Sequence, residues 1–114
     1  MKNKLGKTRK PPMSVITSKA VEQFRKICNH GEDSKREAEL KIERDYMLGR
    51  VVDISYEDNG ICIVQYYDIF MRVNNTIVTS VFRDKNLARS FNDEFGQFEK
   101  NKKKYDKFNK RYRL

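Results

Sequence analysis

The chain has 114 residues, of which 36% are charged and 38% are hydrophobic, and its formal net charge is +9. This length is typical of one domain, and no apolar run approaches the roughly 18 residues that would span a bilayer. The basic N-terminus leads into no apolar segment, so we expect no secretory signal, no membrane partner and a cytoplasmic protein. Two cysteines, Cys28 and Cys62, and a single histidine cannot complete a zinc site. We therefore expect reduced thiols, no metal and no cofactor.

The positive charge is concentrated at the two ends of the chain. Residues 1–10 carry +5, residues 99–114 carry +6, and the remainder carries −2. Clustered cations gain affinity for a polyanion by displacing its condensed counterions, so we expect a nucleic acid or a nucleoprotein as partner. The alternative is a pair of solvated tails without a partner. The expected nucleic-acid contacts of the first tail are Lys2, Lys4, Lys7, Arg9 and Lys10.

The first twelve residues are predicted to form a flexible basic arm, because Pro11-Pro12 favours an extended chain. A helix is predicted over about 18–29, with Ser18 or Thr17 as its N-terminal cap. The Asn-His-Gly segment at 29–31 then ends it, since glycine suits the left-handed position after a helix. The histidine there could act as a general base, but a lone histidine in such a helix stop is more often only favourable beside the negative end of the helix dipole.

A second helix is predicted over about 35–48. Ser34 and Glu37 have the spacing of a capping box, in which each side chain accepts from the other residue's backbone N–H. From Ala38 onward apolar residues recur every four positions, which predicts a buried stripe. Gly49 is expected to end the helix.

The apolar period then changes from four to two, which predicts strands over about 52–56, 61–67, 69–73 and 76–82. The pairs Asn59-Gly60 and Asn74-Asn75 are typical of two-residue hairpin turns. We therefore expect three or four antiparallel strands in meander order. Asp68 either interrupts the strand around it or bulges it.

The helical period returns from about 85 to 112, and one long helix is predicted there, with Gly96 as the point where it could bend. Its apolar stripe comprises Leu87, Phe91, Phe95, Phe98, Tyr105, Phe108 and Tyr112. The half through Phe98 is expected to pack on the sheet. The second half is strongly basic, and its expected nucleic-acid contacts are Lys100, Lys102, Lys103, Lys104, Tyr105, Lys107, Phe108, Lys110, Arg111, Tyr112 and Arg113.

Three interpretations of this basic aromatic segment stay open. Lysines can neutralise phosphates while aromatic faces stack on unpaired bases, which favours RNA over duplex DNA. The aromatics can instead be the buried stripe of an ordinary helix or of a homodimer contact. A basic amphipathic helix can also lie on a membrane or in a groove of a partner protein, although a stripe without Leu, Ile or Trp in its last turns is weakly apolar.

Residues 16–83 carry a resemblance to a known group of proteins. The helix opening Thr17-Ser18-Lys19-Ala20 and the strand ending in Thr79-Ser80-Val81 resemble small phage and mobile-element proteins of the barnase–colicin–RelE ribonuclease group. Members of that group open with a T-x-H-A-x-x-R helix and close with a T-V strand. This chain has lysine in place of the histidine and glutamine in place of the arginine.

The resemblance implies a metal-independent endoribonuclease in which cations and hydroxyls position RNA and stabilise the charge on the phosphorane. The residues that it assigns to catalysis are Lys19, Arg25, Tyr67, Thr79 and Arg83. The lysine substitution also fits a protein that kept the RNA-facing surface and lost cleavage.

Together these patterns predict an α+β fold with two short N-terminal helices, an antiparallel meander and a long basic C-terminal helix. We expect a basic arm over 1–12, a domain over 13–98 and a helical extension over 99–114. The favoured function is binding of nucleic acid, with RNA preferred, without catalysis. The alternatives are the endoribonuclease and a phage-encoded anti-defence inhibitor that occupies the nucleic-acid channel of a host nucleoprotein.

Overall fold

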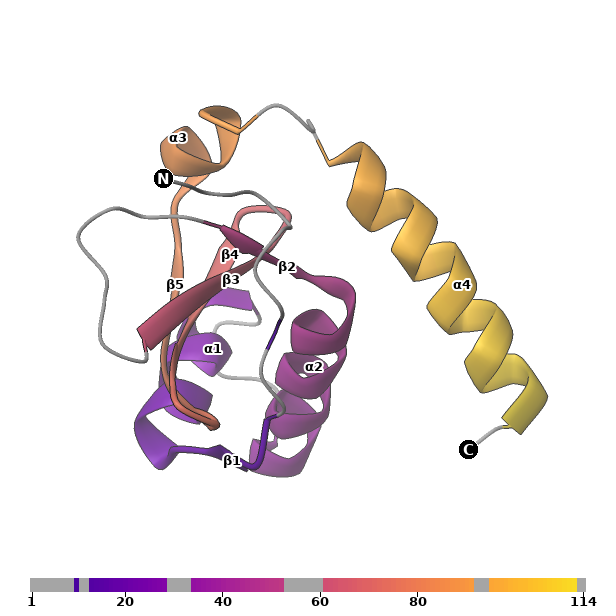
Figure 1. Ribbon diagram of the computed structural model, residues 1–114. Helices are drawn as coiled ribbons and strands as arrows, with labels where there is room; N and C mark the ends of the chain where they lie inside the picture. The colour runs from indigo at the N-terminus through magenta and orange to yellow at the C-terminus, as the bar shows by residue number, and fades with distance from the viewer. Residues whose placement is uncertain (1–9, 11–12, 29–33, 53–60, 92–94, 113–114) are drawn as a thin grey trace.

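In the computed structural model the chain folds around a single mixed β-sheet with helical cover on both faces (Figure 1). The structure describes residues 10, 13–28, 34–52, 61–91 and 95–112, and for residues 28 and 108–112 it describes the backbone alone. The α+β class is confirmed. Most of the expected N-terminal arm, the helix end at 29–31, the strand beyond Val52 and the turn at Asn59-Gly60 lie outside the described residues.

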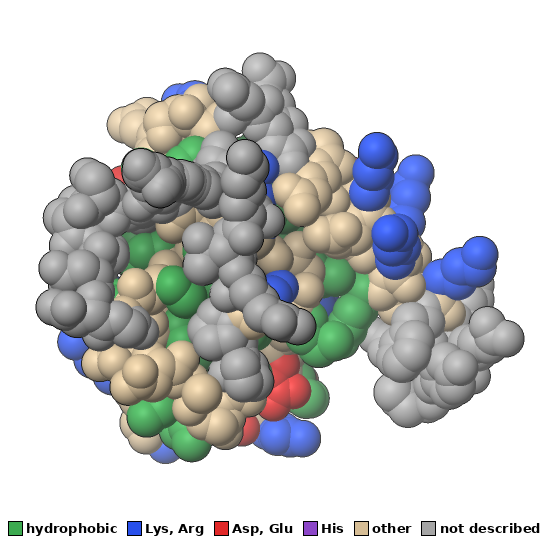
Figure 2. Space-filling model, in the orientation of Figure 1, with side chains coloured by type: hydrophobic (Ala, Val, Ile, Leu, Met, Phe, Trp, Pro, Cys, Tyr) green, Lys and Arg blue, Asp and Glu red, His purple; other side chains and the backbone are tan. Residues whose placement is uncertain are grey.

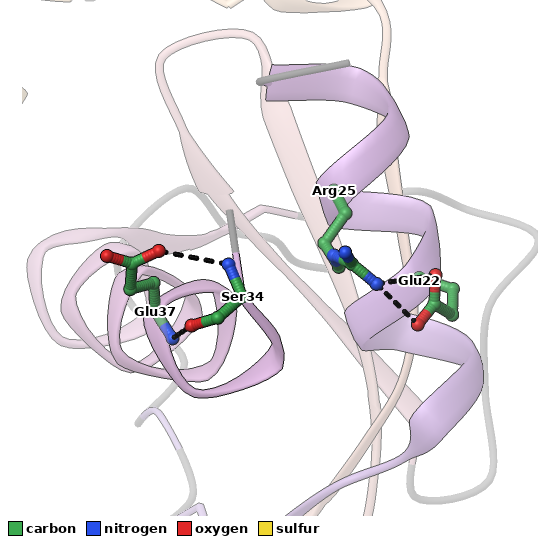
Figure 3. Close-up of polar contacts among 4 residues, drawn as sticks. All are labelled: Glu22, Arg25, Ser34 and Glu37. Atoms are coloured by element: carbon green, nitrogen blue, oxygen red, sulfur yellow. Dashed lines mark hydrogen bonds and ion pairs between the residues drawn. The ribbon is translucent and has the colours of Figure 1, made fainter. Parts of the chain in front are cut away.

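The first two helices have nearly the predicted bounds. Helix α1 spans Ser18–Cys28 and α2 spans Lys35–Leu48. Thr17 is the cap of α1, because its hydroxyl oxygen accepts from the N–H of Ala20 at 3.1 Å. The capping box of α2 is present, with Ser34 and Glu37 each accepting from the other's backbone N–H at 3.1 and 2.9 Å (Figure 3). Local polar contacts therefore fix where both helices begin.

The sheet has five strands in the order β1-β5-β4-β3-β2. Strands β2 (Arg50–Val52), β3 (Ile61–Tyr66), β4 (Ile69–Asn74) and β5 (Ile77–Arg83) form the predicted antiparallel meander. The prediction of a purely antiparallel sheet was wrong, because β1 (Val15–Ile16) pairs in parallel with β5. Two residues are too few to show a period in the sequence.

Two tight turns connect the last three strands. Tyr67-Asp68 joins β3 to β4, so Asp68 marks a turn, and Tyr67 has a φ of 57°. The second turn is Asn75-Thr76, one residue later than predicted, and Asn75 has a φ of 61°. Asparagine tolerates this left-handed region well, whereas tyrosine rarely adopts it, so the conformation of Tyr67 depends on its tertiary contacts.

Each face of the sheet has its own hydrophobic cluster. The larger cluster joins α1 and α2 to one face, and its centre includes Phe24, Ile42 and Met71. The smaller cluster lies on the other face around Phe70 and Ile63, with Ala88 contributed by α3 (Lys85–Arg89). Phe95 packs against both clusters. The sheet therefore buries apolar side chains on both sides, which explains its near-continuous apolar strands.

The prediction of one helix over 85–112 was wrong. The chain forms the short α3 and then α4 (Gly96–Tyr112), and Phe95 between them has a φ of 75°. The ring of Phe91 lies 6.5 Å from that of Phe70 in the smaller cluster, while Phe98 is buried in the larger one. A straight helix would place residues 91, 95 and 98 on one face. The chain must leave the helical path because Phe91 and Phe98 are buried in different clusters.

Gly49 lies where the end of α2 meets β3. Its backbone is extended, with a φ of −81°, so any residue could adopt the conformation. A Cβ atom there would lie 2.6 Å from the carbonyl oxygen of Gln65 and 2.9 Å from that of Asp45. Glycine is therefore required for space, because both obstacles are backbone atoms.

We predict that Gly49→Ala lowers the free energy of unfolding by about 2 kcal/mol or more, since backbone must shift to admit the methyl group. Urea unfolding followed by circular dichroism measures the loss. Ser90→Ala, at an exposed position outside both clusters, is the control and should cost less than half as much. Equal losses in Gly49→Ala and Ser90→Ala would contradict the close approach of Gly49 to the carbonyl oxygens of Gln65 and Asp45.

Candidate nucleic-acid interface

The C-terminal end of α2 receives side chains from both ends of the chain. A helix leaves its last carbonyls without intrahelical partners, and α2 has no basic residue in its last turn. The ammonium of Lys10 donates to the carbonyl oxygens of Tyr46, Met47 and Gly49 at 2.7, 2.9 and 2.8 Å. Asn101, on α4, donates to the carbonyl of Leu48 at 2.9 Å. These contacts attach the N-terminal segment and α4 to the same helix end.

Lys10 is therefore bound within the fold, and its predicted contact with nucleic acid stays a prediction that the interface argued below does not use. Its side chain is half-buried, its Nζ lies 5.3 Å from the centroid of the Tyr46 ring, and burial lowers its pKa. An ammonium with three carbonyl acceptors has no donor left for a phosphate. The other predicted contacts of this arm, Lys2, Lys4, Lys7 and Arg9, lie outside the described residues.

Helix α4 docks on the domain through Phe98. This side chain is 0% exposed, and its ring lies edge-on to Tyr66, with centroids 5.7 Å apart. The hydroxyl of Tyr67 donates to a carboxylate oxygen of Glu99 at 2.7 Å. Burial, and then this hydrogen bond, raise the pKa of Tyr67. The expected packing of Phe98 is thus present, although α4 contacts the end of α2 and the β3–β4 turn.

Arg50 lies under the start of α4. Its guanidinium is 5.3 Å from the ring centroid of Phe98 and 5.9 Å from that of Phe91. Its Nε donates to Gln65 Oε1 at 3.3 Å, and an Nη donates to Gln97 Oε1 at 3.4 Å. Cation–π and hydrogen-bond contacts of this kind hold an arginine in place. Arg50 therefore positions α4.

The outward face of α4 carries a lysine ridge, which comprises Lys100, Lys103, Lys104 and Lys107. At about 100° per residue, these four positions fall within an arc of about 100° centred opposite Phe98. All four side chains are exposed. Lys102 is exposed as well, but its position on the helix lies about 40° from Phe98, outside the ridge. Figure 2 shows Lys and Arg side chains projecting from the side of the molecule where α4 lies. Four of the five lysines whose side chains are described on α4 therefore share one face.

A groove separates the lysine ridge from the end of α2. This α2–α4 groove has a volume of about 440 Å³ and is lined by Met47, Leu48, Asn101, Lys104 and Tyr105. Met47 is 60% exposed, which is unusual for an apolar side chain of this size beside a core. Tyr105 is half-buried and packs against the larger cluster. Its ring is thus one wall of a groove, and its predicted contact with nucleic acid stays a prediction.

A second hollow, of about 340 Å³, lies between α1, α2 and the β3–β4 turn. Its polar walls include Lys41, Arg44 and Asp45 from α2 and Tyr66 and Tyr67 from the sheet. The carboxyl of Asp45 is 2% exposed and accepts from the guanidinium of Arg44 at 2.8 and 3.0 Å. Burial raises the pKa of Asp45 to about 6, although the adjacent Arg44 opposes this.

The residues that the ribonuclease resemblance assigns to catalysis are divided between two regions. Arg83 and Tyr67 lie near each other, because Arg83 pairs with Asp68 at 3.4 Å, directly after Tyr67 in the turn. Arg25 is bound to Glu22 at 3.0 Å within α1 (Figure 3), and Lys19 is exposed at the start of that helix.

Thr79 has a structural environment. It is the extra residue where the register between β4 and β5 shifts, and its hydroxyl donates to the carbonyl of Arg72 at 3.3 Å. It stands about 13 Å from Arg83 along β5. The position equivalent to the motif's arginine, Gln23, accepts from the N–H of Val81 at 2.8 Å. Gln23 thus attaches α1 to β5, and the hydroxyl of Thr79, the matched residue, joins β5 to β4.

Sequence analysis predicted Lys104 and Tyr105 of the groove and Tyr67 of the second hollow as site residues, and it missed the other lining residues. Lys41, Arg44 and Asp45 belong to a charged helix face that could not be distinguished from an ordinary solvated face. A signal for the groove was present, since Met47 is an apolar residue of α2 outside its buried stripe and is 60% exposed. Among the predicted contacts on α4, the side chains of Phe108, Lys110, Arg111, Tyr112 and Arg113 lie outside the described residues.

No protein-family model matches the chain, and no curated protein or solved structure matches it. None of the described helices is long and apolar enough to cross a membrane. In the part of the chain that the structure describes, no three His, Cys, Asp or Glu side chains are grouped to hold a metal ion. The function must therefore be argued from the geometry of this chain alone.

We predict that Lys10→Met lowers the free energy of unfolding by about 2 kcal/mol, because three carbonyls at the end of α2 lose a charged donor. Chemical denaturation at neutral pH measures the effect. Lys26→Met, at an exposed position of α1, is the control and should change stability by a few tenths of a kcal/mol at most. A loss no larger than that of the control would contradict the role of Lys10.

The buried carboxyl of Asp45 predicts a pH dependence. Its pKa of about 6 exceeds the ordinary 3.8, so the folded state holds this proton more tightly than the unfolded chain. The stabilisation is complete below pH 4 and is lost as the pH rises through 6. The asparagine of Asp45→Asn cannot ionise, so the variant does not lose this stabilisation as the pH rises. Between pH 4 and pH 7 the free energy of unfolding of the variant should therefore rise by about 2 kcal/mol relative to that of the parent. Urea titrations at both pH values test this, and a constant difference would refute it.

Proposed function

We propose that this protein binds nucleic acid, with RNA as the preferred form, through the lysine ridge of α4 and without cleaving it. The observation that carries the proposal is the two-sided character of α4. One face is held to the domain by Phe98, Glu99 and Asn101, and the opposite face of its described part presents the four exposed lysines of the ridge. Such a helix offers a fixed row of cations.

The spacing of the ridge suits a phosphate backbone. Lysines three and four residues apart on a helix have neighbouring side chains, with Cβ atoms about 5–6 Å apart. This separation is comparable to the distance between successive phosphates along a strand. Each lysine that neutralises a phosphate releases condensed counterions, so binding gains affinity and becomes salt-dependent.

The concentration of charge also supports a polyanion partner. Residues 99–114 carry +6 while residues 11–98 carry −2. A general requirement for solubility would be met by charges spread over the surface. Glu99 and Asp106 lie three or four residues from Lys102 and Lys103, which offsets repulsion there. Lys100, Lys104 and Lys107 have no acidic residue at these spacings on α4, so they repel one another, and a bound polyanion would relieve that repulsion.

The proposal is tested by replacing the four ridge lysines with glutamine, which keeps helix propensity and removes four charges. For a single-stranded RNA, the slope of log affinity against log salt should become shallower by about 3, at ~0.7 per phosphate contact. The matched control replaces Lys26, Lys35, Arg36 and Lys85, which are exposed on α1, α2 and α3, and should retain most of the slope. Fluorescence anisotropy over a salt series measures both. Equal loss in the two variants would reject the ridge as the binding surface.

The same RNA, incubated with the parent protein in EDTA and run on a denaturing gel, should remain intact. Cleavage that disappears in an Arg83→Ala variant would overturn the assignment to binding alone. It would favour the metal-independent endoribonuclease, with Tyr67 and Arg83 beside the polar hollow as its site.

A further inference from the structure

We infer that the α2–α4 groove receives an unpaired nucleobase of the strand whose phosphates lie on the lysine ridge. The inference rests on the proposed function and specifies its substrate as single-stranded nucleic acid. The groove and the ridge share Lys104, which lines the groove and belongs to the ridge. A strand that follows the ridge therefore has its bases within reach of the groove.

The walls of the groove have the chemistry that a base requires. Tyr105 provides an aromatic ring, and aromatic rings stack on every base because each base has a π-face. Met47 provides a polarizable thioether, which makes favourable contacts with the edges of aromatic rings. Leu48 completes the apolar surface. The volume of about 440 Å³ falls within the range of ordinary small-molecule sites.

Asn101 gives the groove a polar group that can recognise a base edge. One N–H of its amide donates to the carbonyl of Leu48 at 2.9 Å, and this bond fixes the orientation of the amide. An asparagine amide has a second N–H and a carbonyl oxygen. These are a donor and an acceptor of the kind that pair with the exposed edge of an unpaired base.

The charge around the groove selects its occupant. The groove opens beside Lys104, and the neighbouring turns of α4 carry Lys100, Lys103 and Lys107, all exposed. A second copy of this chain that docked through the same face would bring its own ridge toward these lysines and be repelled. A base attached to phosphates brings the opposite charge, which makes the groove and ridge complementary to a single strand. A duplex keeps its bases stacked inside and cannot fill the groove.

The experiment compares four probes of about ten nucleotides by fluorescence anisotropy: single-stranded RNA, single-stranded DNA, an abasic strand of the same length, and a duplex. The parent protein should bind the RNA strand about tenfold more tightly than the abasic strand, which keeps every phosphate and has no base to stack. The single-stranded DNA tests whether binding requires ribose. The duplex tests whether binding requires an unpaired base.

Two variants assign this preference to the groove. Met47→Ser removes an exposed side chain and Tyr105→Leu keeps an apolar contact without the ring, and each should reduce the preference for intact over abasic RNA to about twofold or less. Leu40→Ser is the matched control, since Leu40 is an exposed apolar residue of α2 outside the groove, and it should leave the preference unchanged.

The inference would be overturned if the parent bound intact and abasic strands with equal affinity, or single strands and duplex with equal affinity. The proposed function would survive either result as long as binding kept its salt dependence. Binding to none of the four probes at low salt would reject the proposed function itself.

Discussion

The carbonyl groups at the C-terminal end of α2 are the constraint on which the rest of the structure depends. A helix end carries four such acceptors without intrahelical partners. Here the side chains that donate to them come from residues far away in the sequence. Lys10 binds three of them and Asn101 binds the fourth. The absence of a basic residue in the last turn of α2 leaves the negative end of the helix dipole for Lys10 to satisfy. One helix end thereby organises the N-terminal segment and α4.

Gly49 brings this helix end against the sheet. Its carbonyl is an acceptor for Lys10, and its N–H donates to Asp45. Because it lacks a Cβ, the backbone of β3 can approach closely. The approach brings Leu48 and Met47 beside α4, where they form one wall of the groove. The geometry of the candidate site is thus a consequence of how α2 ends, and the lysine ridge keeps a fixed position relative to the groove because Phe98 and Asn101 attach α4 to that same end.

Local patterns predicted the elements whose causes are local. The capping box and Gly49 gave the bounds of α2, and alternating apolar residues with turn-forming asparagines gave the antiparallel meander. The two-residue β1, the contacts of Lys10 and the break before α4 have tertiary causes that no local pattern carries. The spacing of Phe91, Phe95 and Phe98 fits a continuous helix, yet the rings pack in different clusters, so burial overrode periodicity. At the site, composition predicted a basic helix. The groove could not be predicted, because it depends on how α2 and α4 pack together, and these helices are distant in sequence.

Docking of α4 on the domain stabilises the helix against the repulsion between its lysines. The four ridge lysines form four like-charge pairs at spacings of three and four residues, and each such pair destabilises an isolated helix by about 0.2–0.5 kcal/mol. Glu99 and Asp106 lie at the same spacings from Lys103 and offset part of this repulsion. Burial of Phe98 supplies an opposing term of about 2 kcal/mol, so docking at the first turns offsets the repulsion along the ridge. The attachment points lie at residues 97–101, whereas the ridge extends to Lys107, where Tyr105 alone among the described side chains keeps contact with the larger cluster. The outer turns therefore have the least tertiary support and the highest charge density, which is the arrangement in which a bound strand would add most to the order of the helix.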